Sequence, residues 1–163
     1  AHLQNLTNNG GMTATAAGTL LDQFSTYLSG SPGNTIPRNG LTHLLTARNL
    51  DGSTRGIAYV GVLCNAWYGI GLSEITNNDQ VSSLVLAHEL GHNFGADHDG
   101  ESGEGRTCPN QTGTWLMSPT VGGTDQFSPC SVNVVSQQIA SASCLVNLPP
   151  PNPDVLFENG FEG

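Results

Sequence analysis

The segment from His88 to His98, which reads His-Glu-Leu-Gly-His-Asn-Phe-Gly-Ala-Asp-His, constrains this chain more than any other stretch. His88 and His92 are four residues apart, so on an α-helix both imidazoles project from one face and can share one metal ion. Gly95 can adopt a left-handed conformation that ends the helix and turns the chain back. His98 then follows as a third ligand. Three neutral imidazoles leave one position of a tetrahedral Zn²⁺ open, as in catalytic zinc sites.

Glu89 follows the first histidine and is rotated away from the two helical ligands. Its carboxylate can therefore hydrogen-bond a metal-bound water without being a ligand. A structural zinc site, or three histidines of an ordinary core, is the alternative, but structural zinc sites are closed and rich in cysteine. The spacing predicts one catalytic Zn²⁺, held by His88, His92 and His98, with Glu89 as general base.

Composition excludes several classes of partner. The 163 residues include four Arg, no Lys and 13 acidic residues, which gives a net charge of −9. So few cations cannot neutralise a row of phosphates, and this charge also disfavours anionic membranes. No apolar run approaches the roughly 20 residues of a membrane-spanning helix. We therefore expect no nucleic acid partner and no membrane insertion.

Hydrophobic spacing predicts three helices and three strands. The predicted helices cover residues 13–29, residues from about 77 to 94, and residues 129–142. The second helix begins with a capping box at Asn77–Gln80 and is apolar nearly all round, so we expect it to be buried. Ser128 and Pro129 fit the N-cap and first position of the third helix. The predicted strands are 41–46 and 56–62, as neighbours joined by a turn, and a weaker strand at 70–75.

The extended histidine motif, with Asp99 directly after the third histidine, resembles the adamalysin (reprolysin) branch of the metzincin metalloproteases. Four further segments are similar to that branch. Leu116–Pro119 resembles its Met-turn, whose Met117 would lie beneath the metal, and Phe127–Ser131 resembles its FSxCS segment. Leu44–Thr46 and Ala58–Gly61 resemble two of its strands. The resemblance covers about residues 13–147.

This resemblance implies an α/β (α+β) metzincin fold, with a mixed, mostly parallel sheet, a central zinc-binding helix and a C-terminal helix. Too few residues precede position 13 to supply the strands that open the family domain, so we expect those strands to be missing here. We expect a catalytic domain over residues 1–147, and a Pro-rich linker with a short acidic tail over 148–163. The tail resembles those of some secreted Gram-negative bacterial proteins.

The implied activity is a zinc-dependent endopeptidase, which hydrolyses peptide bonds by a zinc-activated water. We therefore expect protein or peptide substrates, and we expect a monomer. The resemblance places Gly69, Ile70, Gly71 and Leu72 on a cleft-edge strand that pairs with substrate. It places Ser118, Pro119, Thr120 and Val121 in a wall of the specificity pocket. The alternative is a truncated, inactive relative that holds zinc or binds a partner, although every catalytic residue is present.

Four cysteines, an even number without a CxxC pair, are compatible with two disulfides and an oxidising compartment. The resemblance implies the pairs Cys64–Cys144 and Cys108–Cys130, and a secreted, extracellular or periplasmic protein. It gives little support for Ca²⁺. Cys144 and Asn147 match two of four family ligand positions, but Gly40 stands where an Asp is needed.

Overall fold

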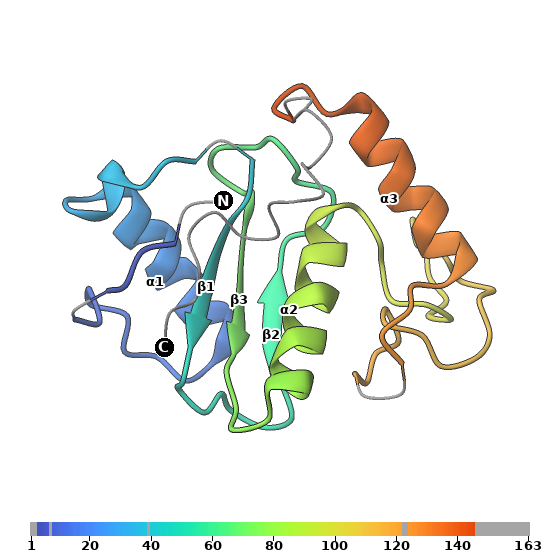
Figure 1. Cartoon of the computed structure of the whole chain (residues 1–163), viewed down its shortest axis with the longest axis horizontal. Coiled ribbons are helices and arrows are strands. Elements are labelled where there is room, and N and C mark those ends of the chain that lie inside the picture. The colour runs from blue at the N-terminus through green and yellow to red at the C-terminus, as the bar shows by residue number, and fades with distance from the viewer. Residues whose placement is uncertain (1–2, 7, 39, 122–123, 146–163) are drawn as a thin grey trace, which may run out of the picture.

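The computed structural model describes residues 3–6, 8–38, 40–121 and 124–145. In this part of the chain a three-stranded sheet lies between α1 and α2, and α3 lies beside α2 on the side away from β1 (Figure 1). The elements are α1 (Ala17–Ser29), the 3₁₀ helix η1 (Gly33–Thr35), β1 (Thr42–Thr46), β2 (Gly56–Ala58), β3 (Ile70–Glu74), α2 (Asp79–Asn93) and α3 (Pro129–Ser141). The expected linker and tail over 148–163, and Asn147, lie outside the described residues.

The sheet has the order β1-β3-β2, with β1 parallel and β2 antiparallel to β3. The prediction that 41–46 and 56–62 are neighbouring strands is therefore wrong. β3, which had the weakest strand pattern, lies between them with all five residues buried. Ile70 and Leu72 pack towards α1, whereas the small Gly71 and Ser73 alternate to the other face. This composition suits a strand that is covered on both faces and paired on both edges.

β2 is shorter than predicted because the chain leaves the sheet to meet α2. The backbone N–H groups of Gly61 and Val62 donate to the carbonyls of His92 and Asn93 at the end of that helix. The Asn93 side-chain amide donates to the carbonyls of Tyr59 and Ile70. These bonds fix the C-terminal end of α2 against the sheet.

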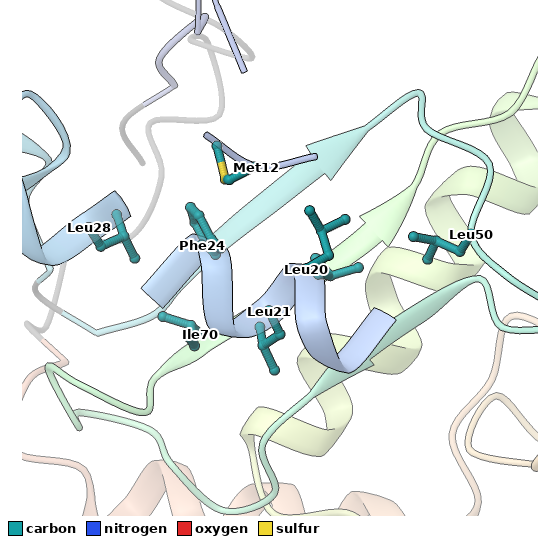
Figure 2. Packing of buried hydrophobic residues seen from close by; sticks show 8 residues of the cluster. Met12, Leu20, Leu21, Phe24, Leu28, Leu50 and Ile70 are labelled. Carbon is teal, nitrogen blue, oxygen red and sulfur yellow. The ribbon is translucent and has the colours of Figure 1, made fainter. Parts of the chain in front are cut away.

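The hydrophobic core lies between α1 and the sheet (Figure 2). Leu20, Leu21, Phe24 and Leu28 recur at helical spacing and are buried against Ile70 and Leu72. The helix begins at Ala17 rather than at residue 13. The N–H groups of Thr13 and Ala14 donate to the side-chain oxygen of Gln23 instead of entering a helix.

Helix α2 begins one residue later than the predicted capping box. Asn78 is the N-cap, and its side-chain oxygen accepts from the Val81 N–H. The buried residues of α2 are Val85, His88, Glu89, Gly91, His92 and Asn93, whereas Val81 is 37% exposed. The expected burial therefore holds for the C-terminal half of the helix, where the metal-site residues lie, and is wrong for the first turns.

Helix α3 begins as predicted, with Ser128 as N-cap and Pro129 in the first turn. Disulfides join Cys108 to Cys130 at the start of this helix and Cys64 to Cys144 beyond its end, which are the pairs implied by the resemblance. The α+β fold class is confirmed, with a sheet that has one parallel and one antiparallel pair. Among the described residues, no helix combines the length and apolarity needed to cross a membrane.

Candidate metal centre

Three histidine side chains meet at one point beside the C-terminal half of α2. His88 and His92 come from one face of the helix, and His98 follows the turn after it. Gly95, with φ of 92°, makes this turn, and the N–H groups of Gly95 and Ala96 donate back to the helix carbonyls of His92 and Gly91. The Nε2 atom of His88 lies 3.1 Å from Nε2 of His92 and 3.2 Å from Nε2 of His98.

The contacts of the Nδ1 atoms show which nitrogen of each ring faces the other histidines. Nδ1 of His88 lies 2.6 Å from the Leu116 carbonyl, and Nδ1 of His92 lies 2.7 Å from the Ala96 carbonyl. Nδ1 of His98 lies 3.2 Å from a carboxylate oxygen of Glu101. Carbonyl oxygens accept hydrogen bonds, so the Nδ1 atoms of His88 and His92 carry the donated hydrogen. The Nε2 lone pairs of these two rings therefore face into the cluster, where Nε2 of His98 also lies.

This arrangement fits a metal ion. A tetrahedral Zn²⁺ with Zn–N bonds of about 2.0–2.1 Å holds its nitrogen ligands about 3.3 Å apart. The two distances from Nε2 of His88 are close to this value, and all three ligand atoms lie within 4.8 Å of one another. Burial lowers the pKa of His88, and burial also lowers the pKa of His92 to about 4, so both imidazoles are neutral at physiological pH. Metal binding needs this neutral form. In the described part of the chain, His88, His92 and His98 form the one cluster of His, Cys, Asp or Glu side chains placed to share an ion.

Glu89 lies next to this cluster and is 6% exposed. Its side chain lies on the backbone of Gly56 in β2, because a Cβ atom at Gly56 would be only 2.6 Å from Glu89 Oε1. Burial raises the pKa of the Glu89 carboxyl to about 8. A carboxyl group in this range can take up and release a proton near neutral pH, as a general acid–base catalyst must.

The turn at Met117 contacts α2 at Gly91, and the preceding Leu116 carbonyl accepts from Nδ1 of His88. Met117 is fully buried, and its backbone carbonyl accepts from the N–H of Asp99, the residue after the third histidine. Asp99 is buried, and its Oδ1 accepts from the hydroxyl groups of Ser128 and Ser131. One carboxylate thus connects the third histidine to the start of α3.

The prediction that residues 69–72 form the edge strand of the substrate cleft is wrong. Gly69, Ile70, Gly71 and Leu72 belong to β3 or directly precede it, and β3 is paired with a strand on each side. Its backbone therefore has no free edge for a substrate. β2 has a free edge, and it is the strand that contacts Glu89. Sequence reasoning gave these strands the wrong order, so it missed Gly56.

The segment from Ser118 to Val121 directly follows the turn at Met117. The Ser118 hydroxyl accepts from the Trp115 N–H, and Pro119 and Thr120 are exposed. Its role as a pocket wall stays a prediction. Sequence reasoning also missed Glu101, whose contact with His98 depends on the path of a loop that has no regular pattern.

Together, the fold and site define an α+β protein with three convergent histidines on a helix and the turn that follows it. The chain matches Metallo-peptidase family M12B, Reprolysin-like, over residues 13–142. Because this match covers most of the 163 residues, the chain belongs to that family. The family resemblance drawn from the histidine motif is thereby confirmed.

Proposed function

We propose that this protein is a zinc-dependent endopeptidase. The observation that carries the proposal is the convergence of the Nε2 atoms of three histidines beside the buried Glu89 carboxyl group. His88, His92 and His98 would hold the ion. Membership of a metallopeptidase family supports this assignment and favours protein substrates.

Zn²⁺ bound there would polarise the carbonyl of the scissile peptide and favour ionisation of a water near neutral pH. Glu89 takes the proton from the attacking water on a carboxylate oxygen and passes it to the leaving amine nitrogen. The Leu116 and Ala96 carbonyls hold the rings of His88 and His92 in the tautomer that directs Nε2 inward. Buried Met117 packs against Gly91, which lies between these two histidines in α2.

The substrate backbone binds along the free edge of β2 as an added strand. The Glu74 N–H donates to the Arg55 carbonyl, so Arg55 and Glu74 are a hydrogen-bonded pair of the antiparallel ladder. Because such pairs alternate along a ladder, the N–H and C=O groups of Gly56 and Ala58 point away from β3. These groups are available to an extended peptide, and Gly56 places that peptide next to Glu89.

We also infer that residues 1–147 act as the catalytic unit, and that the protein is secreted and monomeric. Two disulfides support the oxidising setting. The elution volume of the purified protein tests whether it is a monomer. Electrophoresis of the culture medium and of cell fractions, with and without reductant, tests secretion and the disulfides.

Digestion of denatured casein tests the activity. The zinc-loaded protein should cleave casein, a chelator should stop cleavage, and added Zn²⁺ should restore it. Glu89→Gln should bind Zn²⁺ as the wild type does and lose nearly all cleavage. Glu104→Gln removes an exposed carboxylate and should retain activity. A folded, zinc-loaded wild type that cleaves nothing would favour the rival function, a zinc-binding module without catalysis.

A further inference from the structure

The third histidine differs from the other two in its outer partner. His88 and His92 each donate to a backbone carbonyl, whereas Nδ1 of His98 lies 3.2 Å from the carboxylate oxygen Oε1 of Glu101. His98 also lacks the support of a helix, because it follows the turn at Gly95. Its ring orientation therefore depends on contacts made by the loop around it.

Glu101 is held in place from its other side. Its second oxygen, Oε2, lies 3.2 Å from the guanidinium nitrogen NH2 of Arg106. The NH1 nitrogen of the same guanidinium donates to Oδ1 of Asp97 at 3.1 Å. Arg106 thus joins two carboxylates that flank His98 in the sequence, one residue before it and three residues after it.

Hydrogen bonds also fix the backbone of the loop that carries Asp97, Glu101 and Arg106. The Thr107 N–H donates to Asp97 Oδ2, and the Asp97 N–H donates to the Thr107 hydroxyl. The Gly100 N–H donates to the carbonyl of Cys108, which is joined by a disulfide to Cys130 at the start of α3. These hydrogen bonds and the disulfide therefore fix the loop from which Glu101 contacts His98.

A carboxylate that accepts the outer N–H of a metal-binding histidine fixes its tautomer and makes its inner nitrogen a stronger donor to the metal. Loss of such a partner typically weakens metal affinity about 10–100-fold. Glu101 is 36% exposed and His98 is 27% exposed, so solvent moderates the effect without removing the contact. A direct stabilising role for the fold is smaller, because ion pairs this exposed add little to stability.

We propose that Glu101, held by Arg106, is a positioning residue that sets the zinc affinity of this site through His98. This inference rests on the zinc site of the proposed function. Glu101 is not one of the three ligands, and it acts by orienting the His98 ring. Arg106 supports it indirectly, by fixing the carboxylate.

Zinc affinity, measured by competition with a chromogenic chelator, tests the proposal without any assay of cleavage. Glu101→Ala should weaken Zn²⁺ binding about 10–100-fold. Glu101→Gln, whose amide oxygen can still accept from Nδ1, should recover part of this loss. Arg106→Ala should weaken binding less than Glu101→Ala. Glu104→Ala, which removes an exposed carboxylate from the same loop, is the matched control and should bind Zn²⁺ as the wild type does.

The urea midpoint of the metal-free protein separates positioning from a merely structural role. Glu101→Ala should unfold at the same midpoint as Glu104→Ala. A lower midpoint for Glu101→Ala, or a zinc affinity equal to that of Glu104→Ala, would overturn the inference while leaving the zinc site in place. A wild-type protein that does not bind Zn²⁺ would overturn the proposed function itself.

Discussion

Met117 lies directly against the backbone of Gly91, which precedes the second metal-site histidine in α2. A Cβ atom at Gly91 would be 2.5 Å from Met117 Sδ and 2.9 Å from a ring carbon of Phe127. The turn at Met117 can therefore approach the helix only because residue 91 has no side chain. The Met117 carbonyl also accepts from the Asp99 N–H, so the position of this turn affects the residue next to His98.

Gly91→Ala should destabilise the protein and weaken zinc binding. Alanine in a helix interior is favoured over glycine by about 1 kcal/mol, but overpacking a buried site costs about 1–3 kcal/mol and should dominate. Urea unfolding and zinc competition measure the two effects. Gly18→Ala in α1 is the control, because a Cβ atom there meets nothing within 4 Å. If Gly91→Ala were as stable as Gly18→Ala, the close packing of Met117 on α2 would be refuted.

Gly56→Ala should reduce catalysis while leaving zinc binding intact. The added methyl group would overlap Glu89, with Oε1 at 2.6 Å and Cγ at 2.7 Å, so the carboxylate must move. A displacement of about 1 Å from the reacting atoms can cost about 100-fold in rate. We expect a loss of that order in kcat for casein peptides, with an unchanged zinc dissociation constant. An unchanged kcat would show that Glu89 does not need this position.

Much of the metal site could be predicted from the sequence because it depends on local geometry. The spacing of His88, Glu89 and His92 within one helix places both rings on one face, whatever the rest of the fold does. The Ser128 cap follows from equally local rules.

The strand order could not be predicted in the same way. The pairing of β3 with both β1 and β2 depends on contacts between segments far apart in the chain, and each strand alone was compatible with either order. The contact between Glu101 and His98 depends on the path of an irregular loop, which no periodic pattern in the sequence specifies.

Ser128→Ala should cost more stability than the loss of an ordinary helix cap. The Ser128 hydroxyl accepts from the Ser131 N–H and donates to buried Asp99, so the variant loses a cap and leaves the carboxylate with one fewer donor. We expect about 2.5–4 kcal/mol, the sum of a cap of about 1 kcal/mol and a hydrogen bond to a charged group of about 1.5–3 kcal/mol. Asn78→Ala removes only the exposed cap of α2 and should cost about 1 kcal/mol. Equal losses in urea unfolding would argue against the bond to Asp99.

The free energy of unfolding should decrease as the pH is lowered, because His43 is held neutral in the folded protein. His43 lies on β1, away from the metal site. Its Nε2 lies 2.8 Å from the Ser73 hydroxyl, and burial lowers its pKa from 6.5 to about 4. Between these two values the unfolded chain binds a proton that the folded protein does not, so the free energy of unfolding decreases as the pH falls. From pH 7.5 to pH 5 this amounts to at most about 2 kcal/mol.

His43→Gln retains a polar partner for Ser73 but cannot take up this proton. Urea unfolding of both proteins in chelator, so that loss of metal does not contribute, should show that the advantage of the wild type over the variant shrinks as the pH is lowered from 7.5 to 5. The other ionisable groups are common to both proteins and cancel in this difference. A difference that stays constant over this range would mean that His43 is not held neutral in the folded protein.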